Sequence, residues 1–142
     1  MSITLTRADG YVLSTDRARL DRPAIHRYLA EESYWAKGMD RARLDRAIEH
    51  SLCYGVYAPD GSQVGFGRVI TDYATAAYLT DIYVIEAVQG LGLGKWMVEA
   101  MLAHPDLQGL RRWMLGTRDA HGLYAKFGFV DKPEGRAMVR PG

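Results

Sequence analysis

The chain has 142 residues, 48% of them hydrophobic and 25% charged, so residues 1–142 are expected to form one domain around one core. A formal net charge of +1 argues against a nucleic-acid partner or an anionic membrane surface, and no apolar run is long enough to span a bilayer. Residues 1–6 lack the pattern of a secretion signal and Cys53 is the only cysteine, so no intrachain disulfide can form and a cytoplasmic protein is expected.

The first fifty residues predict one strand and two helices. A strand is expected at Tyr11–Ser14. Pro23 suits the first position of a helix, where its missing N–H costs nothing, and apolar residues continue at helical spacing to Glu32. Gly38 breaks the chain, and Asp40 can cap a second helix.

The middle of the chain changes to a strand pattern. Leu52–Ala58 and Gln63–Thr71 are rich in β-forming residues and flank the turn signal Pro59–Ser62. We therefore expect an antiparallel hairpin, followed by a third strand at Thr75–Ile85.

The last third predicts a strand–helix–strand unit. Apolar residues recur at i, i+3, i+4, i+7 and i+8 from Leu93, and the helix is expected to end at His104. A strand at Arg111–Thr117, a short helix at Asp119–Phe127 and a last strand within residues 129–139 should follow. This order predicts a mixed α/β (α+β) fold with a mostly antiparallel sheet, a βαβ core and flanking helices.

A glycine-rich loop, Gln89–Lys95, joins the third strand to the amphipathic helix. The start of a helix offers unpaired N–H groups and a partial positive charge, so a phosphate is the natural occupant. A Walker loop would need Ser or Thr after the lysine, but Trp96 follows Lys95. A Rossmann loop would need a third glycine where Lys95 stands. Both nucleotide interpretations are therefore disfavoured.

The spacing of Gln89, Gly92 and Gly94 matches Q/R-x-x-G-x-G/A, and the strand Ile82–Ile85 precedes it. In this region the chain resembles the GNAT superfamily of acetyl-CoA-dependent N-acyltransferases. The resemblance implies that the loop holds the pyrophosphate of acetyl-CoA, through Gln89, Gly90, Leu91, Gly92, Leu93, Gly94 and Lys95.

A second signature, Leu123–Phe129, reads L-Y-x-K-F-G-F and is similar to the GNAT segment that lines the thiol end of the cofactor. The resemblance implies that Tyr124 protonates the departing thiolate, since a phenol with a pKa near 10 stays protonated at neutral pH. Tyr124 also has a structural interpretation as the apolar contact of a Schellman ending, with Gly128 left-handed and Phe129 beyond it. The two roles are compatible. Asp119 is the expected N-cap of this helix.

The implied reaction is direct attack of an amine on the thioester in a ternary complex. In the family the strand before the loop binds the pantetheine arm, which here points to Ile82, Tyr83 and Val84, with Val84 N–H as donor to the thioester oxygen. Thr117 would face the pantetheine or the acyl group, and the first two helices would cover the acceptor.

The general base is the least defined part of the prediction. Asp81 is the first candidate, followed by Asp72, Glu86 or a water molecule, and Asp81 could instead be a carboxylate that holds a loop. On the acceptor side, Glu32, Tyr34 and Trp35 would suit a cationic amine through charge pairing and cation–π contact. The alternative there is a solvated helix end with Trp35 packed in the core. The acceptor is expected to be a small-molecule or peptide amine.

Other chemistries have little support. Cys53 is expected to be a small buried apolar residue, and no grouping of ligands has the spacing of a metal site. A CoA-binding regulatory module without catalysis is the main alternative function. Exposed sheet edges would allow a homodimer.

Overall fold

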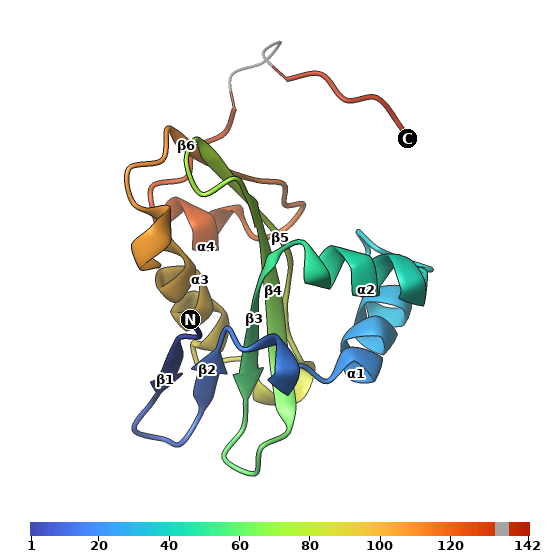
Figure 1. The fold of residues 1–142 in the computed structure, drawn as a ribbon, viewed down its shortest axis with the longest axis vertical. Coiled ribbons are helices and arrows are strands. Elements are labelled where there is room, and N and C mark those ends of the chain that lie inside the picture. Colours follow the sequence, from blue (N-terminus) through green and yellow to red (C-terminus); the bar gives the residue numbers. More distant parts are fainter. Residues whose placement is uncertain (133–136) are drawn as a thin grey trace.

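The computed structural model describes residues 1–132 and 137–142, which form a mixed sheet with helices on both faces (Figure 1). The described strands run in the order β1-β2-β3-β4-β5-β6. Their bounds are Thr4–Thr6 (β1), Val12–Ser14 (β2), Leu52–Tyr57 (β3), Gln63–Thr71 (β4), Ala76–Val84 (β5) and Arg112–Leu115 (β6). Neighbours pair antiparallel from β1 to β5, whereas β5 and β6 pair parallel, which confirms the predicted fold class.

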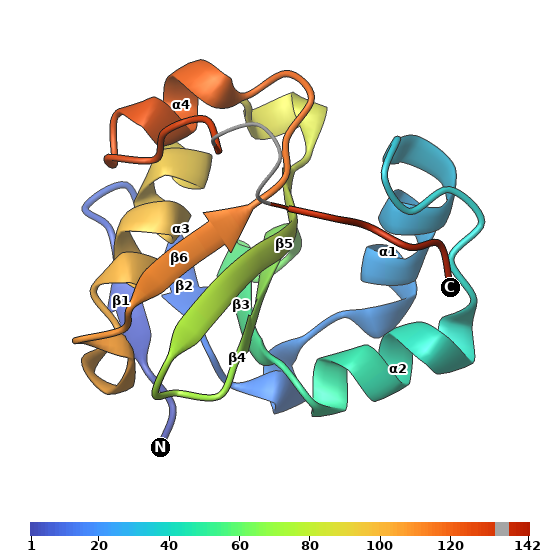
Figure 2. The ribbon, with the colours of Figure 1, turned by 90° about the horizontal axis from the view of Figure 1, so that it is seen from above.

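The helices form two layers, with α3 and α4 on one face of the sheet and α1 and α2 on the other (Figure 2). Their bounds are Arg22–Arg27 (α1), Arg41–Glu49 (α2), Leu93–Leu102 (α3) and His121–Ala125 (α4). A π-helical turn covers Tyr28–Glu32, and 3₁₀ turns cover Arg17–Arg19, Glu86–Val88 and Pro105–Leu107. None of the described helices has both the length and the apolar character needed to cross a membrane.

Each face of the sheet has its own apolar core. Met97 and Met101 of α3 pack with Val69 and Leu79 on one face. On the other face, residues of both helices pack against two aromatic side chains of the sheet: Ile25, Leu29, Leu44 and Ile48 against Phe66 and Tyr83. The sheet is therefore packed against helices on both faces, and the connecting loops lie at its two ends.

The sequence predicted most helix starts and missed some ends. Asp40 caps α2 by accepting from Arg43 N–H, as expected. The first helix does not stay α-helical to Glu32, because its last turn is π-helical and ends where Ser33 N–H donates to Tyr28 O. Residues 129–132 and 137–139 contain no strand, so the prediction of a last strand was wrong there; residues 133–136 lie outside the described residues.

Strand β5 contains a β-bulge. Arg68 pairs with Thr80 and Phe66 with Tyr83, so two residues of β5, Asp81 and Ile82, lie opposite Gly67 alone. Asp81 has a φ of 56°. A Cβ at Gly67 would lie 2.6 Å from Met101 Cε and 3.1 Å from Met97 Sδ, so α3 crosses directly over the bulge.

Candidate active site

The parallel pair β5–β6 opens partway along β5. The two strands pair from Ala76 opposite Arg112 to Leu79 opposite Leu115, where β6 ends, while β5 continues to Val84. The C-terminal part of β5, residues 80–84, therefore has no strand partner on the β6 side within the described residues.

The open edge of β5 presents backbone groups of alternate residues. Ile85 N–H donates to Val64 O on β4 at 2.9 Å, so Val84 and Ile82 must direct their N–H and C=O groups to the opposite, open side. Gln89 Nε2 donates to Val84 O at 3.1 Å, which agrees with this direction. The backbone N–H and C=O of Tyr83 face β4 instead. The Tyr83 side chain stacks on Tyr28, with ring centroids 3.8 Å apart.

The glycine-rich loop presents a run of unpaired donors. No described group accepts a hydrogen bond from the backbone N–H of residues 90–95, and Gly92, with φ 74°, is the N-cap of α3 without any side-chain cap. The nearest heavy atom to an added Cβ at Gly94 is Val84 Cγ2 at 3.9 Å, and nothing lies within 4 Å at Gly90 or Gly92. Free donors, open space and a helix start fit a pyrophosphate. The side chain of Leu93 is buried in the core, so only its backbone is available to such an anion.

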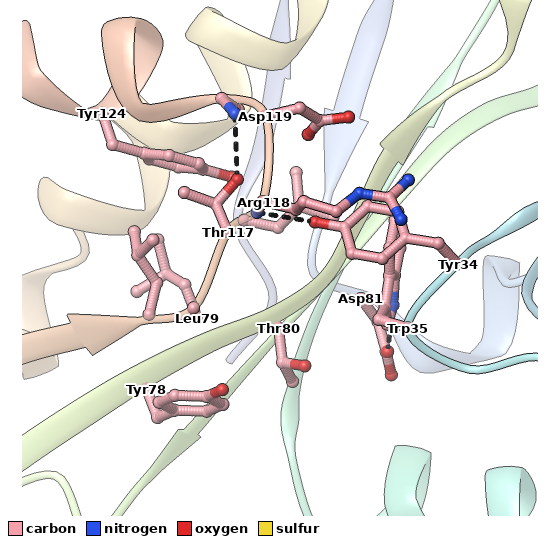
Figure 3. A pocket seen from close by; sticks show the side chains of 14 residues that line it. Tyr34, Trp35, Tyr78, Leu79, Thr80, Asp81, Thr117, Arg118, Asp119 and Tyr124 are labelled. Carbon is pink, nitrogen blue, oxygen red and sulfur yellow. Dashed lines mark hydrogen bonds between the residues drawn. The ribbon is translucent and has the colours of Figure 1, made fainter. Parts of the chain in front are cut away.

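A pocket of about 430 Å³ lies where β5 and β6 separate (Figure 3). It brings together six of the candidate site residues from the sequence: Tyr34, Trp35, Asp81, Ile82, Thr117 and Tyr124. Val84 and the glycine loop are not among its lining residues, and Glu32 is exposed elsewhere at the end of its turn. The sequence had not singled out Tyr78, Thr80 or Arg118, which also line the pocket.

Tyr124 has the structural role that was considered from the sequence, and it also lines the pocket. Gly128 has a φ of 88°, Phe129 N–H donates to Tyr124 O at 3.2 Å, and the two rings lie 5.9 Å apart, so the Schellman ending is confirmed. The ring points from α4 toward Thr117 (Figure 3). Burial, and then the nearby Tyr34 and Asp119, raise the pKa of the Tyr124 phenol. The group is therefore kept protonated beside the pocket.

Asp81 is the centre of a buried polar network. Arg68 Nε donates to Asp81 Oδ2 at 2.8 Å, and Trp35 Nε1 donates to Oδ1 at 3.0 Å. Arg68 also reaches Ser51 Oγ at 2.9 Å. Asp81 thus ties the loop that carries Trp35 to the sheet. The sequence signal that could have identified Arg68 as a site residue is a single arginine inside an otherwise buried strand.

The loop with Tyr34 meets the segment after β6 over the pocket. Arg118 N–H donates to Tyr34 Oη at 2.9 Å, and the Arg118 guanidinium lies 3.8 Å from the centre of the Tyr34 ring. Thr117 Oγ1 accepts from Ala120 N–H at 3.0 Å. The prediction of Asp119 as N-cap was wrong: α4 starts after Ala120, and Thr117 satisfies that N–H.

The other reactive groups do not line the pocket. Asp72 lies in the β4–β5 turn. The hydrogen bond from the Thr75 hydroxyl has the largest effect in lowering the pKa of its carboxyl, and backbone N–H donors lower it further. Glu86 is exposed in its 3₁₀ turn. Burial raises the pKa of Cys53 to about 11. No group of three or more potential metal ligands occurs in residues 1–132 and 137–142.

A mixed α/β fold whose sheet opens beside a glycine-rich helix start is an arrangement that suits a phosphate-bearing ligand. The chain belongs to the acetyltransferase (GNAT) family, whose model matches residues 15–129. The resemblance noted from the two motifs is thereby confirmed, and the protein is an acetyltransferase of that family.

Relatives agree in sequence and in structure. A candidate acetyltransferase of Gibberella zeae is 37% identical, over 85% of this chain and 78% of its own length. The crystal structure of a candidate GNAT-family acetyltransferase from Xanthomonas campestris pv. campestris is 48% identical with a TM-score of 0.88, covering 93% of this chain and 92% of that one. A GNAT acetyltransferase from Elizabethkingia anophelis with acetyl-CoA bound shares the fold, with 17% identity and a TM-score of 0.65 over 88% and 79% of the two chains.

Proposed function

We propose that this protein transfers the acetyl group of acetyl-CoA to a primary amine by direct attack in a ternary complex. Transfer from acetyl-CoA is the general reaction of its family. The observation that carries the proposal is the order of three features along the chain: β5 contributes Asp81 to a pocket that also contains Tyr124, its open edge follows, and unpaired N–H groups at residues 90–95 come next.

The backbone would bind the co-substrate. N–H groups of residues 90–95 hold the pyrophosphate at the start of α3. Ile82 and Val84 offer N–H groups on the open edge of β5, which suit the amides of a pantetheine arm and a thioester oxygen. Bound acetyl-CoA supplies an activated thioester.

Side chains in the pocket would move the protons. Asp81 takes the proton of the ammonium group; two of its lone-pair positions are used by Arg68 and Trp35, and others are free. The amine nitrogen then bonds to the carbonyl carbon, the carbon–sulfur bond breaks, and Tyr124 gives its proton to the sulfur. The second proton of the new nitrogen–carbon adduct passes through water to the Tyr124 phenolate, which leaves a neutral amide and restores the phenol. If Asp81 only holds the Trp35 loop, a water molecule takes the first proton.

The acceptor would enter between the first two helices, α1 and α2, and the loop after β6. Tyr34 and Trp35 are 38% and 41% exposed and present aromatic surface at the pocket, which suits a cationic amine. Glu32, two residues before Tyr34 in the chain, adds a negative charge. The acceptor is a small-molecule or peptide amine.

The test is turnover of acetyl-CoA with a panel of amines: amino acids, polyamines, aminoglycosides and lysine peptides, with release of thiol as the signal. Tyr124→Phe is the matched control, because it keeps the ring of the Schellman contact and removes only the hydroxyl. We expect turnover to fall about 100-fold or more in this variant, with the Kd for CoA unchanged. Binding of CoA without turnover of any amine would support the regulatory module instead.

A further inference from the structure

The N-terminal hairpin β1–β2 reaches the glycine-rich loop through one side chain, Arg7. Its Nη1 donates to Leu91 O at 3.0 Å. Its Nε and Nη2 bind the two carboxylate oxygens of Asp9 at 3.2 and 2.6 Å. The guanidinium also lies 5.4 Å from the centre of the Trp96 ring in the first turn of α3. Arg7 is therefore fixed between the hairpin, the loop and the helix.

The bond from Arg7 determines how one peptide group of the loop is turned. Leu91 lies between Gly90 and Gly92, whose φ values are 90° and 74°. In a planar trans peptide the carbonyl of Leu91 and the N–H of Gly92 point in opposite directions. Glycine accepts either sign of φ, so this peptide group could turn over at little cost without an external contact. Because Arg7 binds the carbonyl, Gly92 N–H faces away from Arg7.

We propose that Arg7 is a positioning residue for a pyrophosphate ligand, and that it acts by holding the Leu91–Gly92 peptide with its N–H toward the anion. Gly92 N–H then extends the run of free donors at the start of α3. Asp9 already compensates the charge of Arg7, so Arg7 acts through the loop and not by contact with the ligand. The inference rests on the proposed function, since it assumes that this loop binds CoA.

The test is the Kd for CoA, measured by calorimetry on the whole chain. Arg7→Gln should raise the Kd about tenfold, because the charge-assisted bond to Leu91 O is lost. Arg7→Lys should fall between wild type and Arg7→Gln, since one ammonium group can bind the carbonyl but cannot also bind Asp9 in two places. Arg19→Gln is the matched control: this arginine also stacks on an aromatic ring, 4.5 Å from the centre of Tyr57, but has no bond to the loop.

A second readout separates positioning from general loss of structure. In amide NMR spectra, Arg7→Gln should displace the Gly92 signal and reduce its shift on addition of CoA, while Arg19→Gln should leave both unchanged. Asp9→Asn is a milder variant that loosens Arg7 and should raise the Kd less than Arg7→Gln.

The outcomes distinguish the two proposals. A folded wild type that does not bind CoA overturns the proposed function, and this inference with it. Wild-type binding with an Arg7→Gln Kd within about twofold of it overturns the inference alone, as does an equal loss in Arg19→Gln.

Discussion

Removal of the Asp81 charge should destabilise the fold strongly. The side chains of Arg68 and Asp81 are only 11% and 4% exposed, and they bind each other at 2.8 Å. Asp81→Asn leaves the guanidinium buried without a counter-charge, which costs about 3–5 kcal/mol of unfolding free energy. The asparagine oxygen can still accept from Trp35 Nε1, so the loss reports on the ion pair. Urea unfolding at neutral pH measures it as a lower midpoint at constant slope.

Two further variants make this measurement decisive. Asp45→Asn removes an acid whose ion pairs with Arg22 and Arg41 are both partly exposed to solvent, and it should lose only a small fraction as much stability. Arg68→Met combined with Asp81→Asn removes both charges and should recover most of the loss, because no buried charge stays unpaired. If Asp81→Asn costs no more than Asp45→Asn, the reasoning on the buried network is wrong.

Three more predictions concern single groups. Gly128→Ala should cost about 1–2 kcal/mol, because a Cβ is strained at a φ of 88°; an unchanged melting temperature would contradict this. Cys53, whose pKa is raised to about 11 by burial, should react with a thiol reagent at pH 8 only after unfolding, so rapid reaction of the native protein would show the burial to be wrong. Burial raises the pKa of Tyr57 to about 12, and also raises those of Tyr54 and Tyr83. Since the unfolded chain loses these protons near pH 10 and the native state keeps them, the melting temperature should fall above about pH 10, and a flat profile to pH 11 would argue against it.

The features that the sequence predicted well are those with local signals. The glycine loop, the amphipathic helix α3 and the ending at Gly128 each depend on residues a few positions apart, and each could be recognised from spacing alone. The strands from β3 to β6 followed from alternating or apolar runs between turn residues. β1 was missed because Thr4–Thr6 is exposed throughout and has no alternation of burial.

The features that the sequence did not predict depend on pairing across the fold. The bulge at Asp81 follows from the register of β4 against β5, which no single segment records. The contacts of Asp81 with Trp35 and Arg68, and of Arg7 with Leu91, join residues far apart in the chain. α4 begins after Ala120 without a side-chain cap, and Thr117 accepts from the Ala120 N–H before the helix, an outcome that the capping propensity of Asp119 does not predict.

The central claim is that acetyl-CoA binds with its pyrophosphate at residues 90–95. Calorimetric titration of CoA into wild type and into Gly92→Asp combined with Gly94→Asp tests it most directly. Both positions have open space for a side chain, although the φ of 74° at Gly92 strains an aspartate there by about 1–2 kcal/mol, so the urea midpoint of the variant is measured first to establish that it folds. The two carboxylates of the folded variant repel a pyrophosphate. The account predicts a wild-type Kd on the order of micromolar and no detectable binding in the variant. A folded wild type that does not bind CoA, or a variant that binds it as tightly as wild type, would contradict the account.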